Sequence, residues 1–153
     1  RTHIGICLGA LAALLVSACS TVPPSRNEKR LERLVAELNT AGEDRLIELT
    51  ALPFLLDGET IAREEDLRTL WRNLRAAGFT FADAEIADIA EAGPDSYRTF
   101  SDDPEVQAFF AKHTGKDAAL VRLTTGHGTF FLISAGRAGR LPKLYGFTSR
   151  EGN

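Results

Sequence analysis

Every cysteine of the chain lies within its first 19 residues, and this limits how the rest of the chain can be held together. After Cys7 and Cys19 there is no further thiol. Residues 20–153 therefore form no disulfide among themselves, offer no thiolate nucleophile and provide no cysteine ligand for a metal. We expect a domain that is stabilised by the packing of its apolar side chains, and this length of chain is sufficient to bury a core.

The segment from Ile4 to Val16 is apolar and uncharged, and it follows the basic residues Arg1 and His3. It is shorter than the ~20 residues that a helix needs to cross a bilayer. A short apolar segment behind a basic start is typical of a secretory signal peptide. An uncleaved membrane helix is the alternative.

The residues at the end of this apolar segment resemble the lipobox of bacterial lipoproteins, with Val16, Ser17 and Ala18 before Cys19. The resemblance implies that a signal peptidase recognises Val16, Ser17 and Ala18 and removes residues 1–18. It also implies that Cys19 carries acyl chains such as palmitate, which would anchor the protein stably in a membrane. An ordinary secretory signal that happens to precede a cysteine is the alternative.

The residues after Cys19 indicate where such a protein would reside and where its domain begins. Ser20 is not the aspartate that tends to retain lipoproteins in the inner membrane, so the resemblance favours the outer membrane, facing the periplasm. Residues 19–27 contain a Pro-Pro pair and are expected to be a lipidated tether. We expect one α+β domain over 28–149 and a flexible tail over 150–153.

The charge of the chain excludes one class of partner. The formal net charge is −3 at pH 7, which argues against nucleic acid and against broad adsorption to anionic lipid. No motif for a cofactor is found, and none is expected.

Helical periodicity dominates the first half of the domain. Apolar residues recur at helical spacing in a first helix, at Leu31, Leu34, Val35 and Leu38. We expect a second helix over 43–52, stopped by Pro53, and a third that opens with three acidic residues and ends at Gly78. Asp57-Gly58 is a turn dipeptide.

Strand patterns dominate the second half. Residues 79–91 fit a helix or a strand, and flanking glycine and aromatic residues favour the strand. Tyr97 to Phe100 is expected to continue the sheet, and Asp103-Pro104 to begin a helix. Alternating patterns then predict three strands that form an antiparallel meander, over 119–124, 129–134 and 143–148.

Helices followed by late strands predict an α+β fold, with the helices packed on one face of a curved antiparallel sheet. The first helix, the run Pro53 to Gly58 before a third helix, and the closing hairpins resemble the nuclear transport factor 2-like, cystatin-like cone. The resemblance implies a cone-like sheet that ends in a C-terminal β-meander. It also implies that a carboxylate can project into an apolar interior, as in the isomerase-like members of that family.

The candidate catalytic residues are few. Asp57 is the candidate for a pocket carboxylate, with His127 or Tyr145 as its polar partner, but an Asp-Gly pair is more simply a turn. His127 lies between two glycines and His113 ends a predicted helix, where a cation is favourable. Their spacing predicts no metal site.

Binding is the function that this sequence favours. Several aromatic residues could line a pocket, namely Trp71, Phe79, Phe81, Phe130 and Tyr145, although core packing explains most of them. Arg137 and Arg140 in a Gly-rich loop could contact an acidic partner. We expect a membrane-anchored module, without catalysis, for a protein or a small apolar ligand. A small-pocket enzyme of isomerase or dehydratase type with Asp57 as base is the alternative.

Overall fold

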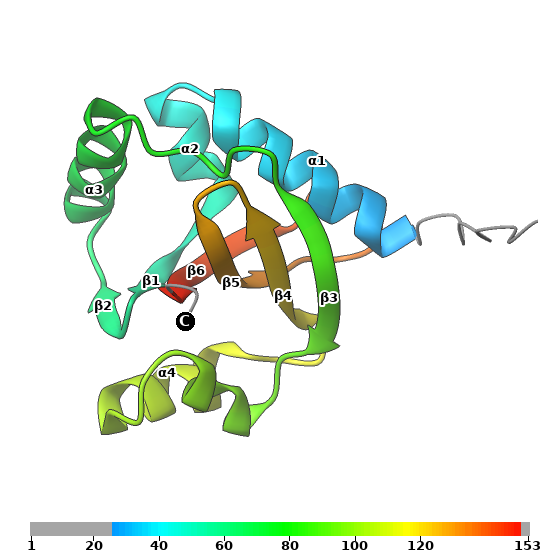
Figure 1. Cartoon of the computed structure of the whole chain (residues 1–153). Helices are drawn as coiled ribbons and strands as arrows, with labels where there is room; N and C mark the ends of the chain where they lie inside the picture. The colour runs from blue at the N-terminus through cyan, green and yellow to red at the C-terminus, as the bar shows by residue number, and fades with distance from the viewer. Residues whose placement is uncertain (1–25, 151–153) are drawn as a thin grey trace, which may run out of the picture.

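The computed structural model describes residues 26–150, which form an α+β fold around one six-stranded sheet (Figure 1). The expected signal peptide, Cys19, most of the expected tether and the last three residues lie outside the described range. The helices are α1 (Arg26–Thr40), α2 (Glu43–Leu49), α3 (Glu64–Ala76), the short 3-10 helix η1 (Pro94–Thr99) and α4 (Pro104–His113). The strands are β1 (Thr50–Leu56), β2 (Glu59–Ile61), β3 (Glu85–Glu91), β4 (Ala118–Thr125), β5 (Gly128–Ala135) and β6 (Lys143–Arg150).

The sheet is mixed, which corrects the expectation of a wholly antiparallel sheet. Its strand order is β2-β1-β6-β5-β4-β3. β1 and β6 pair in parallel, whereas every other neighbouring pair is antiparallel. The parallel pair arises because β6, which is last in the chain, enters the sheet beside β1, which is first. Two-residue turns join β1 to β2 and β4 to β5, and a longer loop joins β5 to β6.

The larger core lies between one face of the sheet and the first three helices. The apolar stripe predicted for α1 is confirmed, because each of its four residues is buried. Leu46 and Leu49 of α2 and Leu67 and Trp71 of α3 add to the same core. The amphipathic spacing of these helices therefore buries one face of each against the sheet.

The opposite face of the sheet is covered by α4 and η1, so the helices do not all lie on one face as expected (Figure 1). Val106, Phe109 and Phe110 of α4 form a second, smaller core with Leu55 and Ile133. Leu55 and Ile133 point away from the first core because successive side chains of a strand alternate between its two faces. The start of α4 is as predicted: Asp103 caps it by accepting the N–H of Glu105 at 2.8 Å.

The helix predicted over 43–52 is too long. It ends at Leu49, and Thr50 begins β1, which continues through Pro53. Proline is tolerated there because the register of β1 against β6 is interrupted between Thr50 and Leu55, so the strand needs no N–H from Pro53.

The middle of the chain is partly as predicted. The strand preferred for 79–91 is confirmed over 85–91, while Phe79 and Phe81 lie before it and pack into the core. The expectation that Tyr97 to Phe100 continues the sheet is wrong, because residues 94–99 form a 3-10 helix with proline at its start. Among the described residues, no helix is both long enough and apolar enough to cross a membrane.

Candidate functional site

Asp57 lies in the turn between β1 and β2. Its φ is +47° and that of Gly58 is +102°, the left-handed pair that suits an Asp-Gly hairpin turn. The exposed carboxylate accepts the backbone N–H of Ser149 at 3.1 Å, and the N–H of Asp57 donates to the carbonyl of Phe147 at 3.2 Å. The side chain therefore fastens the turn to the end of β6 and does not project into an apolar interior.

His127 and Tyr145 do not join Asp57 in one site. His127 is exposed in the turn between β4 and β5, where its backbone N–H donates to the Thr125 hydroxyl at 3.1 Å. Tyr145 packs against the smaller core on the α4 side of the sheet. Within residues 26–150, no hydrogen bond joins any two of these three side chains, so the structure does not assemble an acid–base pair from them.

The other aromatic residues suggested as a pocket lining form one packed cluster. Phe79 and Phe81 meet at 5.2 Å between ring centroids, and Phe81 and Phe130 meet at 5.4 Å. Trp71 joins the cluster through Phe147, at 6.3 Å. These edge-on and tilted contacts are the arrangement that aromatic rings prefer in a core. Most of these rings therefore pack against one another within the larger core.

Trp71 nevertheless also borders a pocket. The pocket has a volume of about 270 Å³ and lies between the α1–α2 connection, α2 and α3. Its lining is mostly apolar and comprises Ala41, Gly42, Glu43, Leu46, Trp71, Arg72 and Arg75. Trp71 is 2% exposed, and its indole N–H has no hydrogen-bond partner among the described residues. A buried donor without a partner is uncommon in native proteins and costs stability.

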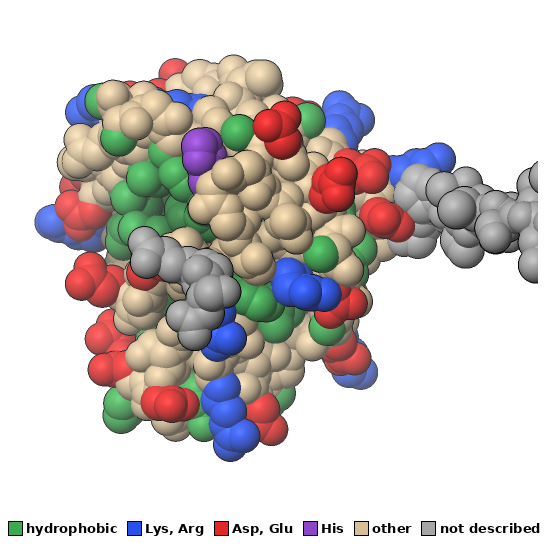
Figure 2. Space-filling view, viewed as in Figure 1, with side chains coloured by type: hydrophobic (Ala, Val, Ile, Leu, Met, Phe, Trp, Pro, Cys, Tyr) green, Lys and Arg blue, Asp and Glu red, His purple; other side chains and the backbone are tan. Residues whose placement is uncertain are grey.

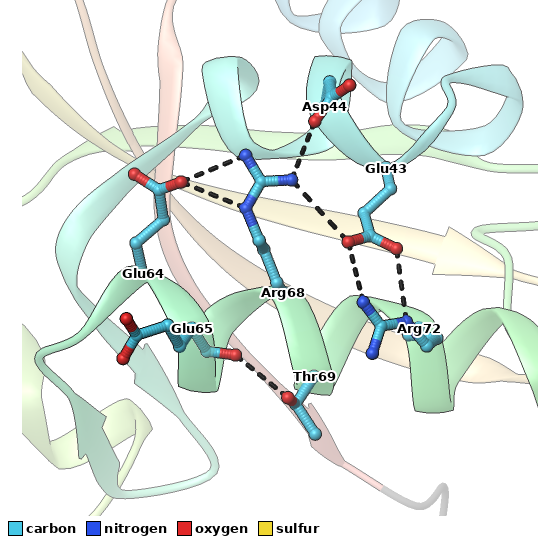
Figure 3. Close-up of polar contacts among 7 residues, drawn as sticks. All are labelled: Glu43, Asp44, Glu64, Glu65, Arg68, Thr69 and Arg72. Carbon is cyan, nitrogen blue, oxygen red and sulfur yellow. Dashed lines mark hydrogen bonds and ion pairs between the residues drawn. The ribbon is translucent and has the colours of Figure 1, made fainter.

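A network of ion pairs holds α2 and α3 together beside this pocket (Figure 3). Arg72 pairs with Glu43 at 2.9 Å, and Arg68 pairs with Asp44 at 2.7 Å and with Glu64 at 3.0 Å. The hydrogen bond from Arg72 holds the pKa of Glu43 below its usual value. The Glu43–Arg72 pair forms part of the pocket rim, so the same contact that joins the helices also borders the opening.

Arg75 forms the other wall of the pocket. Its guanidinium donates to the carbonyl of Leu38, near the end of α1, and to the carbonyl of Ala41 at 3.5 Å. The same group reaches the carbonyl of Phe79 at 3.4 Å. Arg75 thus satisfies carbonyl groups that the end of α1 leaves without helical partners. The pocket is lined on both sides by residues that also hold the three helices in place.

A polar groove of about 430 Å³ lies at the far side of the domain, beside Tyr145. It is formed where α4 ends, where β4 begins and where β5 leads into its loop, and its polar lining comprises Lys112, His113, Lys116, Asp117, Arg137 and Tyr145. His113 ends α4 as predicted, and its ring lies 5.1 Å from that of Phe109.

The sequence indicated some residues of these sites and missed others. Trp71, Tyr145, His113 and Arg137 were identified singly. Lys112, Lys116 and the α1–α2 residues that border the Trp71 pocket were not, because only the tertiary fold brings them beside the others. No group of His, Cys, Asp and Glu side chains within residues 26–150 is arranged to hold a metal ion.

Comparison of the sequence with protein-family models and with curated proteins gives no match.

Proposed function

We propose that this chain is a lipid-anchored protein of the bacterial cell envelope whose domain binds a small apolar ligand without catalysing a reaction. The lipobox-like residues before Cys19 support the anchor, and Ser20 favours the outer membrane, facing the periplasm. A cone-like sheet that ends in a β-meander belongs to the same proposal. It is supported by the antiparallel pairing of β4 with β5 and of β5 with β6.

The observation that carries the ligand proposal is the unpartnered indole N–H of Trp71 beside an apolar pocket. Ligand sites are mostly apolar, with a few polar groups that fix orientation. A compact hydrocarbon with one hydrogen-bond acceptor would match the pocket, with its acceptor on the indole N–H. The N–H itself is buried, so the indole ring has to rotate before an acceptor in the pocket can reach it.

The enzyme alternative has less support. A base of isomerase or dehydratase type must lie beside its substrate in a site from which water is excluded. Asp57 is exposed in a turn, and its carboxylate is engaged with the backbone of β6. The sequence also suggested a protein partner in place of a small ligand. Such a partner would be detected by cross-linking and not by titration with a small molecule.

The ligand site can be tested by NMR, because Trp71 is the single tryptophan of the chain and its indole N–H gives one resonance. Cyclohexanone, which carries an acceptor, should shift this resonance downfield in a saturable way, whereas cyclohexane should not produce a hydrogen-bond shift. Ala41→Leu should abolish the effect by filling the pocket. Ala76→Leu, at an exposed position of α3 outside the pocket lining, is the matched control. An indole resonance unmoved by cyclohexanone would rule out this site.

The anchor is tested separately by metabolic labelling of the full-length protein with radioactive palmitate. Cys19→Ser should lose the label because serine cannot accept the thioether-linked lipid. Cys7→Ala should retain it, because that residue lies within the segment expected to be removed. Undiminished labelling of the Cys19→Ser variant would contradict the lipoprotein proposal.

A further inference from the structure

The net charge of −3 is distributed unevenly over the domain. The end of the sheet where α1 begins carries an excess of basic side chains from three separate parts of the chain. These are Arg26, Lys29 and Arg30 in α1, Lys112 and Lys116 around the end of α4, and Arg137, Arg140 and Lys143 in and beside the β5–β6 loop. Five acidic residues lie in the same segments or line the same pockets, namely Glu28, Glu32 and Glu37 in α1, together with Glu91 and Asp117. We refer to this surface as the basic end.

The basic end is one continuous surface. Lys116 borders both the groove beside Tyr145 and a second pocket of about 430 Å³ that is also lined by Asn27 and Arg30. Arg30 donates to the carbonyl of Arg137 at 2.8 Å and to the carbonyl of Arg140 at 2.9 Å. These bonds hold the β5–β6 loop beside the first turns of α1, as Figure 1 shows. The backbone of the loop at Arg137 and Arg140 is therefore held beside the first turns of α1.

Acidic side chains gather on the other side of the domain. The first turn of α3 contains Glu64, Glu65 and Asp66, and that of α2 contains Glu43 and Asp44. Figure 2 shows acidic side chains along the side formed by α3 and β2, and further acidic side chains on the side where α1 begins. Most of these carboxylates are paired with Arg63, Arg68 or Arg72, so this side carries only a small acidic excess.

The position of the lipid relative to the basic end follows from the chain itself, given the proposed lipidation of Cys19. Cys19 precedes Arg26 by seven residues. Even when fully extended, this length of chain spans only about 25 Å. The start of α1, and with it the basic end, must then lie within that distance of the membrane surface, while the acidic side is separated from it by the width of the domain.

We propose that the basic end faces the membrane and binds the phosphate groups of anionic phospholipids. This inference rests on the proposed anchor. Each basic side chain close to an anionic membrane is worth about fivefold in the binding equilibrium. That gain is insufficient to bring a freely diffusing domain with a net charge of −3 to an anionic membrane. For an anchored domain it is sufficient to set orientation, because the tether keeps the local lipid concentration high.

The experiment uses the lipidated protein reconstituted into vesicles of phosphatidylcholine, with or without phosphatidylglycerol. A single spin label is placed through Ala138→Cys on the basic end or through Glu65→Cys on the acidic side. A nickel chelate on a lipid headgroup serves as the relaxation agent. We expect the label at position 138 to relax faster when phosphatidylglycerol is present, and added salt to reverse this. The label at position 65 should respond little.

A charge-matched pair of variants identifies the residues responsible. Lys116→Gln combined with Arg137→Gln removes two basic side chains, each worth about fivefold. The ratio of domains with the basic end on the membrane to domains turned away from it should therefore fall about 25-fold. Arg63→Gln combined with Arg150→Gln removes the same charge elsewhere and should leave the ratio unchanged. Equal responses from the two labels, no dependence on phosphatidylglycerol, or an equal loss in both double variants would overturn the inference. A protein that fails to enter the vesicles at all would instead contradict the proposed anchor.

Discussion

Gly146 of β6 packs directly against the backbone of Leu55 of β1. A Cβ placed on Gly146 would collide with the carbonyl oxygen of Leu55 and would lie 2.8 Å from its Cβ. This contact occurs at the parallel pairing of β1 and β6, where Leu55 is the direct partner of Gly146. Glycine is therefore required there by the close approach of two strands.

Gly146→Ala should destabilise the domain by about 1–3 kcal/mol or more. The new methyl group would meet the backbone of Leu55, which cannot move aside as the end of a flexible side chain can. The matched control is Gly115→Ala, since a Cβ on Gly115 meets nothing within 4 Å. The control should be neutral or more stable by up to about 1 kcal/mol. Urea unfolding of both variants measures the difference. Equal stabilities would mean that β1 and β6 do not approach as closely as described.

Phe110→Ala should cost about 3–5 kcal/mol, as expected for truncating a large buried side chain. Phe110 is 0% exposed and belongs to the smaller core that joins α4 to the sheet. Lys112→Ala, an exposed change in the same helix, should alter the unfolding free energy by less than about 0.5 kcal/mol. Chemical unfolding checks both values. A loss below about 1 kcal/mol for Phe110→Ala would show that α4 does not cover the second face of the sheet.

Acid should weaken the contact between α2 and α3. The hydrogen bond from Arg72 lowers the pKa of Glu43 in the folded state. A lowered pKa stabilises the fold above the pKa of the unfolded state, about 4.3 for glutamate, and this contribution is lost as the pH falls through the folded value.

The stability advantage of the wild type over Glu43→Gln should therefore shrink as the pH falls below about 4.3. Glu59→Gln, at an exposed position of β2, is the control and should track the wild type. Thermal unfolding over this pH range makes the comparison. An advantage over Glu43→Gln that stays constant down to the lowest pH would refute a role for the Glu43–Arg72 pair.

Local patterns in the sequence predicted the elements, whereas distant pairings set their arrangement. The stripe from Leu31 to Leu38 and the cap at Asp103 depend on residues a few positions apart, so both are readable directly. The parallel pairing of β1 with β6 is not, because it joins segments about 90 residues apart, such as Asp57 and Ser149 with a separation of 92. The placement of α4 depends on the same pairing, because α4 packs against Leu55, and the pairing of β1 with β6 places Leu55 in the sheet.

The candidate sites show the same division. Trp71 was identifiable as a large apolar residue of a helical stripe, but its pocket also needs Ala41 and Gly42, which come from the α1–α2 connection. The basic end combines α1 with the β5–β6 loop through Arg30, over separations of 107 and 110 residues. No local pattern encodes such a surface.

Asp57 provides the last prediction, because the enzyme alternative depends on it. Its φ of +47° is a conformation that asparagine and aspartate adopt more readily than other residues with side chains. Asp57→Asn should be nearly silent in stability, since the amide oxygen can still accept the N–H of Ser149. Asp57→Ala loses that bond as well as the turn preference, and it should cost about 1–2 kcal/mol.

The same two variants separate a turn residue from a catalytic base in the cyclohexanone titration monitored at Trp71. For a turn residue, the affinity should be unchanged in Asp57→Asn, because Asp57 does not border the Trp71 pocket. Glu59→Gln, two residues further along the same hairpin, is a control for the charge that is removed. If Asp57→Asn were as stable as the wild type yet changed the titration more than tenfold while Glu59→Gln did not, Asp57 would have to act within a ligand site. That result would favour the enzyme alternative over a binding module.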